Sequence, residues 1–248
     1  PVASTVNVAM QVLIAAYPAA LLHRDEQGRT PLHYLLWYHA PQRKPETVAL
    51  FVKNLNHNET AVKLYQQQFP TQVLPQQKLH AALVSDNLYG CFPLHYAAVH
   101  GASLAVLTVL LQVWPNSKHS MDRQGRTALH WYLGAGYYDT KTTVTGEAIT
   151  MGQQMIAHDG DVIQLLCSSR VARTVDKLER TLLHWACVHA AHQCIESLPA
   201  RPVHFQTLLD AYAGQLTSRD SKGKTPVMLL LETGVELQKK KWEEKQVA

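Results

Sequence analysis

Histidine and cysteine are the side chains of this sequence best suited to chemistry, and several of them lie close together. Cys187, His189, His192 and Cys194 form the one local cluster among fourteen histidines and four cysteines. Cysteine and histidine are the usual tetrahedral ligands of zinc. The spacing of these four residues matches no familiar zinc motif, and Cys187 falls where a small buried residue is expected. We therefore expect no metal and no other cofactor.

Motifs that would specify catalysis are missing from the sequence. There is no glycine-rich phosphate loop ending in Lys-Ser/Thr, no Gly-x-Ser-x-Gly and no His-Glu-x-x-His. We expect a chain that is not an enzyme. A regulatory or targeting domain of a larger enzyme is an alternative.

A repeated frame contains four of the remaining histidines. Each copy begins with Asp or Asn, has Gly or Glu three positions later, and ends eight positions later with His or Met. The copies are Asp25–His33, Asn87–His95, Asp122–His130, Asp176–His184 and Asp220–Met228. Internal repetition of this kind is typical of repeat architectures.

The frame predicts a tight turn followed by the start of a helix. Asp can cap its own backbone, and Gly accepts a positive φ angle. A threonine hydroxyl can cap the new helix, and proline fits its first position. The ring nitrogens of the final histidine can bond to neighbouring backbone or hydroxyl groups, so we expect that histidine to lock the turn to the helix.

At these residues the chain resembles the ankyrin repeat, whose hallmark is Thr-Pro-Leu-His after a β-turn. The copies depart from that pattern at Phe92, Ala128, Glu179, Leu182 and Met228. Starting positions 25, 87, 122, 176 and 220 are separated by 62, 35, 54 and 44 residues, whereas the family's period is about 33. The resemblance therefore implies divergent repeats with insertions.

The expected fold class is all-α, an ankyrin-like solenoid of helix–turn–helix units joined by hairpin loops. We expect one domain, 1–248, with units 1–24 (partial), 25–55, 56–86, 87–121, 122–175, 176–219 and 220–248. Residues 56–86 are interpreted as a degenerate repeat rather than an insertion, because their surplus is about one period. A long loop is expected over 137–158. Helices 225–232 and 235–245, separated at Gly234, are expected to form a polar cap.

Composition and charge limit the cellular compartments in which the chain is expected. Hydrophobic residues make up 46% and charged residues 17%, and the net charge is +4, which is typical of a folded chain. No apolar run reaches the roughly 20 residues of a membrane span. Four cysteines without a Cys-x-x-Cys pair indicate a reducing, intracellular location, in the cytoplasm or alternatively the nucleus. The chain begins with Pro1, which suggests an excised domain or a processed chain.

The resemblance implies that partners contact the hairpin tips and the inner face of each first helix. The positions it selects are Glu26, Gln27, Arg29, Trp37, Tyr38, Leu88, Tyr89, His100, Arg123, Gln124, Arg126, Lys177, Arg180, His189, Lys222 and Lys224. Basic residues predominate in this set, and arginine and aromatic residues dominate binding hot spots. We expect a non-catalytic scaffold that binds a protein or peptide through this face, and the basic residues favour an acidic partner. The competing interpretation is that the tips carry charge for solubility.

A nucleic-acid-binding repeat domain is a further alternative, but the net charge is small and no recognised nucleic-acid module is present.

Overall fold

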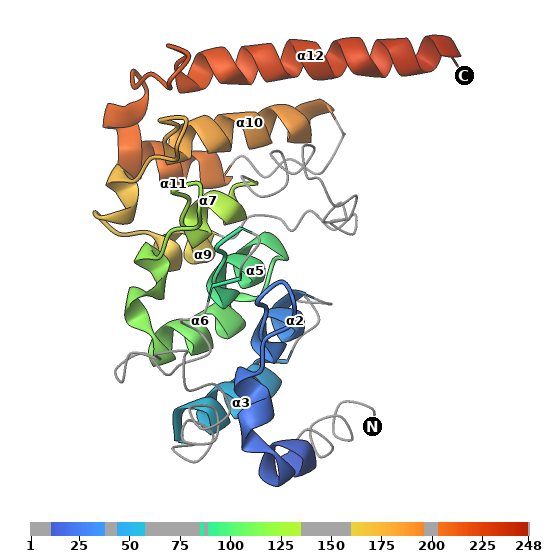
Figure 1. Cartoon of the computed structure of the whole chain (residues 1–248). Coiled ribbons are helices and arrows are strands. Elements are labelled where there is room, and N and C mark those ends of the chain that lie inside the picture. The colour runs from blue at the N-terminus through green and yellow to red at the C-terminus, as the bar shows by residue number, and fades with distance from the viewer. Residues whose placement is uncertain are drawn as a thin grey trace. The chain divides into compact units, whose positions relative to one another are not determined.

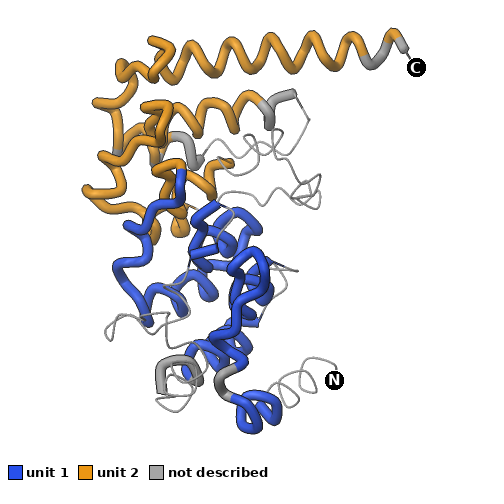
Figure 2. Tube along the Cα trace, viewed as in Figure 1, with its two compact units in different colours: residues 1–123 blue, residues 124–248 orange. Residues whose placement is uncertain are grey.

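A computed structural model shows an all-helical chain (Figure 1). It describes residues 11–37, 44–57, 85–86, 89–134, 160–195 and 203–247, and these contain no β-strand. Two compact units are present, residues 1–123 and 124–248 (Figure 2). One continuous domain was expected. The division falls inside the third turn frame, between Arg123 and Gln124.

The described part of the first unit contains two complete pairs of helices. After a helical stretch at 11–16 and the short 3₁₀ helix η1 (Pro18–Leu22), these are α2 (Pro31–Trp37) with α3 (Pro45–His57), and α5 (Pro93–Val99) with α6 (Leu104–Val113). The 3₁₀ helix η4 (Pro115–His119) follows. In this unit α2 packs on α5, and α3 packs on α6. First helices therefore contact first helices, and second helices contact second helices.

This packing corrects the interpretation of residues 56–86. A repeat between the two pairs would separate α2 from α5 and α3 from α6, but both contacts are direct. The side chain of His33 also reaches the carbonyl oxygen of Cys91 at 3.2 Å. A repeat formed by residues 56–86 therefore does not lie between these two pairs. Residues 58–84 lie outside the described residues.

The second unit repeats the same arrangement. Its helices are α7 (Ala128–Tyr132), α9 (Gly160–Leu166), η6 (Val171–Arg173), α10 (Leu182–Ile195), α11 (Val203–Tyr212), η7 (Ala213–Gln215) and α12 (Pro226–Val247). The first helices α7, α10 and α12 pack in succession, and α9 packs on α11. Buried leucines and Trp185 fill the core between them. The loop expected over 137–158 lies outside the described residues.

The turns have the conformation that the frame predicts. Four of the five copies place glycine at the fourth position with φ between 70° and 78°, and Glu179 occupies the same position with φ 59°. This left-handed region is open to glycine and disfavoured for other residues. The frame therefore fixes the backbone at this position even where its glycine has been replaced.

Two details of the helices differ from the sequence-based expectation. The C-terminal segment is one helix, α12, and Gly234 lies inside it. A single glycine costs a helix only about 1 kcal/mol, and the packing of α12 on α10 outweighs that cost. The exposed face of α12 is mixed, since Leu231, Val235 and Trp242 are exposed beside charged residues such as Glu232 and Lys239. The expected polar cap does not account for these three apolar residues.

Among the described residues, no helix combines the length and the apolar content that crossing a membrane requires.

Candidate partner-binding surface

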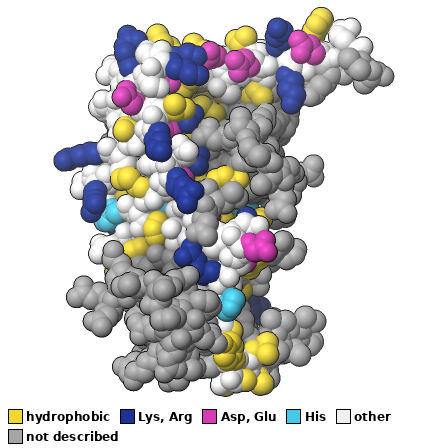
Figure 3. Space-filling view, viewed as in Figure 1, with side chains coloured by type: hydrophobic (Ala, Val, Ile, Leu, Met, Phe, Trp, Pro, Cys, Tyr) yellow, Lys and Arg dark blue, Asp and Glu magenta, His cyan; other side chains and the backbone are white. Residues whose placement is uncertain are grey.

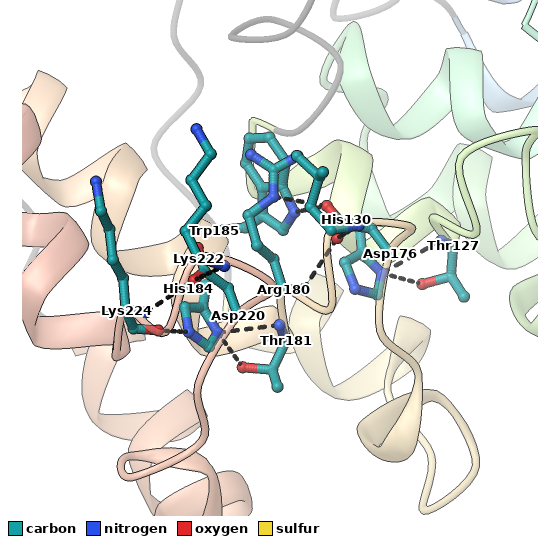
Figure 4. A network of polar contacts seen from close by, with 11 residues as sticks. Thr127, His130, Asp176, Arg180, Thr181, His184, Trp185, Asp220, Lys222 and Lys224 are labelled. Atoms are coloured by element: carbon teal, nitrogen blue, oxygen red, sulfur yellow. Dashed lines mark hydrogen bonds and ion pairs between the residues drawn. The ribbon is translucent and has the colours of Figure 1, made fainter.

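The acidic residue that opens each frame organises its turn, and Asp176 does so most completely (Figure 4). One carboxylate oxygen accepts the backbone N–H groups of Leu178 and Arg180, at 2.8 and 2.9 Å. The other accepts Nε of Arg180 at 2.8 Å and Nε1 of Trp185 at 3.1 Å. Because Asp176 is buried, these four bonds replace the water that its carboxylate loses.

Arginine side chains fold inward from the turns onto tryptophan rings. The guanidinium carbon of Arg180 lies 4.0 Å from the ring centre of Trp185, and that of Arg126 lies 4.8 Å from Trp131. In the first unit Arg29 lies 4.4 Å from Trp37. Such cation–π contacts stabilise a fold most when they are desolvated. These arginines therefore belong to the interior of the turns.

Tyrosine takes the place of Trp185 in the first unit. The hydroxyl of Tyr34 donates to Asp25 at 2.6 Å, and the hydroxyl of Tyr96 donates to Asp86 at 2.8 Å. Asp86 also accepts the N–H groups of Tyr89 and Gly90. The second frame is thus one residue longer than the sequence indicated, since Asp86 performs the capping expected of its neighbour at position 87. Residues 87 and 88 lie outside the described residues.

Two of the frame histidines, His33 and His184, link their own turn to its helix and to the next turn. Nδ1 of His33 accepts the N–H of Thr30 at 3.0 Å, so its Nε2 carries the proton and donates to the oxygen of Cys91. His184 makes the same pair of bonds, to Thr181 at 3.0 Å and to the oxygen of Lys224 at 3.0 Å. Burial lowers the pKa of His33 to about 4 and also lowers that of His184. Both rings are therefore neutral at pH 7.

Successive turns are joined at their tips by backbone hydrogen bonds. In the second unit the N–H of Lys177 donates to the oxygen of Gln124 at 2.8 Å, and the N–H of Ser221 donates to the oxygen of Leu178 at 2.9 Å. In the first unit the N–H of Arg123 donates to the oxygen of Tyr89 at 2.8 Å. These bonds fix the spacing between neighbouring tips, so side chains there project from a common ridge within each unit.

The structure divides the sixteen expected contact residues into three groups. The exposed ones are Glu26, Gln27, Arg123, Gln124, Lys177 and Lys222. The buried or partly buried ones are Arg29, Trp37, Tyr89, His100, Arg126, Arg180, His189 and Lys224. Tyr38 and Leu88 lie outside the described residues. Only the first group presents side chains fully to solvent.

The excess of exposed positive charge at the turn tips is therefore smaller than expected. Arg29 and Arg126 are 7% and 3% exposed, and Arg180 bonds to Asp176. Lys224 forms an ion pair with Glu232. The arginines turn inward because each meets an aromatic ring. Figure 3 shows basic, acidic and hydrophobic side chains interspersed over the second unit rather than a uniformly basic face.

The exposed tips of the second unit combine charge with apolar surface. Lys177 and Lys222 are exposed, and Leu178, which lies between them in the ladder of tips, is 42% exposed. Figure 4 shows Lys222 extending away from the polar network below it. Glu179 adds one exposed negative charge. We call the surface formed by Gln124, Lys177, Leu178, Ser221 and Lys222 the tip ridge.

Sequence reasoning missed the aromatic residues that follow the frame histidines. Tyr34, Tyr96, Trp131 and Trp185 each occupy the position directly after a frame histidine. In all four the side chain bonds to the acidic residue of its turn or stacks with the frame's arginine. The recurrence of an aromatic residue at this position in the sequence could have predicted that it contacts the turn.

The Cys/His cluster shows no sign of metal chemistry in its described part. Cys187 is buried, and burial raises the pKa of its thiol to about 11, whereas zinc binds the thiolate. The described residues contain no group of three or more His, Cys, Asp or Glu side chains placed to hold a metal ion. The side chains of His192 and Cys194 lie outside the described residues.

No protein-family model and no curated protein matches this chain.

Proposed function

We propose that the chain is a divergent ankyrin-type array that serves as a non-catalytic scaffold and binds a partner protein through its turn tips. The repeated turn, with its positive φ and its histidine cap, supports the family assignment. The packing of first helices on first helices and second helices on second helices within each unit supports it too. Fold alone does not define function, so the proposal rests on a particular surface.

The ladder of tips in the second unit is the observation that carries the proposal. Its backbone bonds, from Lys177 to Gln124 and from Ser221 to Leu178, hold neighbouring tips in register. Their buried supports, Asp176 and His184, are fully bonded. A rigid base that presents exposed side chains limits the entropy lost on binding. This is the arrangement that a recognition surface requires.

The tip ridge favours a partner with both acidic and apolar groups. Lys177 and Lys222 offer exposed ammonium groups, and Leu178 offers apolar area between them. Charged groups at the rim steer association, and apolar groups at the centre supply affinity. A nucleic-acid ligand is less well served, because Arg126 and Arg180 point into the fold and stack on tryptophan instead of facing a phosphate backbone.

Affinity capture with a matched control tests the proposal. The full chain is used as bait in nuclease-treated cell extract, as wild type, as Lys177→Glu/Lys222→Glu and as Arg170→Glu/Arg173→Glu. The control pair is also exposed, at the N-cap and the last residue of η6, and is not part of the tip ridge. We expect a protein that the control retains and that the tip variant binds roughly tenfold more weakly or worse. A partner that both variants retain equally, or one that disappears with nuclease, would refute the proposal.

A further inference from the structure

The outer face of α12 is an apolar stripe that no described element covers. Leu231, Val235 and Trp242 are 64%, 66% and 63% exposed, and Val227 and Met228 are about half exposed. Isolated exposed apolar side chains are common, but a contiguous group on one face marks an interaction surface. Hydrophobic side chains are visible along the outer edge of α12 between charged ones (Figure 3).

The stripe has the spacing of a helix-pairing seam. Met228, Leu231, Val235, Gln238 and Trp242 are separated by three, four, three and four residues. That alternation is the heptad pattern of two helices packed side by side. The opposite face of α12 carries the less exposed residues Pro226, Leu230 and Leu237, and α12 packs on α10 within the unit. The seam therefore faces away from the core.

Charge along α12 is divided between its two halves. Residues 226–237 contain Glu232 and Glu236 and no Lys or Arg, which gives −2. Residues 238–247 contain four lysines and two glutamates, which gives 4 − 2 = +2. A second α12 running in the opposite direction would place each negative half beside a positive half. A parallel copy would instead place like charges together.

We propose that two copies of this chain associate through α12, with the two helices antiparallel across the stripe. In this register Leu231 of each copy packs near Trp242 of the other, and Glu232 of each copy lies beside Lys239 of the other. The exposed pairs Lys224–Glu232 and Lys239–Glu243 can exchange for these contacts at small cost, because exposed ion pairs contribute little. The interaction is isologous, so it closes as a dimer. It goes beyond the proposed function, since the tip ridge is not involved.

The area of the α12 interface determines how tightly the two copies are expected to bind. Twenty-two residues of helix extend for about 33 Å, and one helix on each side gives an interface at the lower end of the range for specific complexes. We therefore expect a dimer with a dissociation constant on the order of 10 μM.

Sedimentation velocity of the full chain, from about 1 to 500 μM, tests the association. Wild type is expected to shift from monomer to dimer over this range. Val235→Glu places a charge at the centre of the seam in both copies and is expected to weaken dimerisation about 100-fold. The control is Val175→Glu, a change at an exposed apolar residue outside α12, which is expected to leave the dimer intact. A chain that stays monomeric, or a dimer that Val235→Glu leaves unchanged, overturns the proposal.

Charge exchange tests the antiparallel orientation. Glu232→Lys and Lys239→Glu each place like charges opposite one another, so each is expected to weaken the dimer roughly tenfold. The double variant Glu232→Lys/Lys239→Glu restores opposite charges only if position 232 faces position 239, and it is expected to recover wild-type association. Far-UV circular dichroism checks that α12 stays helical in every variant. A double variant no stronger than the single ones would overturn the antiparallel arrangement.

Discussion

Replacing Asp176 by asparagine should separate the two functions of this carboxylate. Asparagine keeps one oxygen, which can still accept the N–H groups of Leu178 and Arg180. Its amide NH₂ would face the Nε of Arg180 and Nε1 of Trp185, which are both donors. Two buried bonds to the charged carboxylate are lost, one of them from the charged guanidinium of Arg180, and two donors are left facing a third donor.

The size of this effect follows from those bonds. A neutral buried bond contributes about 1 kcal/mol, and a bond to a charged group about 1.5–3 kcal/mol. We expect Asp176→Asn to lower the free energy of unfolding by about 3 kcal/mol. The side chain is 1% exposed, so solvent cannot replace the missing partners. Urea denaturation followed by circular dichroism at 222 nm measures the loss.

Asp220 supplies the matched control for this experiment. Its carboxylate accepts the N–H groups of Lys222 and Lys224 at 2.9 and 2.8 Å, as Asp176 does for its own turn. The frame around Asp220 has Leu229 where the other copies have an aromatic residue. Asp220→Asn should therefore cost under about 1 kcal/mol. If Asp176→Asn cost no more than Asp220→Asn, the stabilising role assigned to the Arg180–Trp185 network would be refuted.

Two further predictions concern backbone strain and pH. Glu179→Gly should raise the free energy of unfolding by about 1 kcal/mol, because Glu179 has φ 59° in the left-handed region; an unchanged urea midpoint would contradict this. Burial lowers the pKa of His33 and of His100 from 6.5 to about 4. Between these pH values each histidine is protonated in the unfolded chain but not in the folded chain. The free energy of unfolding therefore falls as pH drops from 6.5 towards 4. His100→Phe should keep the stacking on Trp37 and Tyr96 and reduce that fall. It should cause no loss at pH 7, because Nε2 of His100 is buried without a hydrogen-bond partner among the described residues. His33→Phe should destabilise the fold at pH 7 by breaking the bonds to Thr30 and Cys91, and equal effects of both changes at pH 7 would contradict these assignments.

The local parts of this fold were readable from the sequence because they depend on neighbouring residues. The start of a helix near the end of each frame was predicted and is observed for α2, α5, α7, α10 and α12, since the turn and the helix start are contiguous in the chain. The positive φ at the frame's fourth position and the histidine cap were also predicted. Each involves residues at most a few positions apart, where steric and hydrogen-bonding rules act directly.

Long-range partners were the part that the sequence did not reveal. Nothing near residues 56–86 indicates that α2 contacts α5, because that contact joins residues about sixty positions apart. The inward turn of Arg126 depends on Trp131 lying over the same turn, so its exposure was misjudged from its place in the hairpin. Gly234 looked like a helix end, but packing of α12 on α10 holds the helix through it.

Hydrogen–deuterium exchange of the chain with its captured partner would test the proposed scaffold most directly. The account predicts slower exchange on binding at the turn tips, around Gln124, Lys177 and Lys222, with α9 and α11 unchanged. The same partner should give no such slowing with Lys177→Glu/Lys222→Glu. Slower exchange confined to α9 and α11, with the tips unaffected, would place the binding surface on the second helices and contradict the central claim.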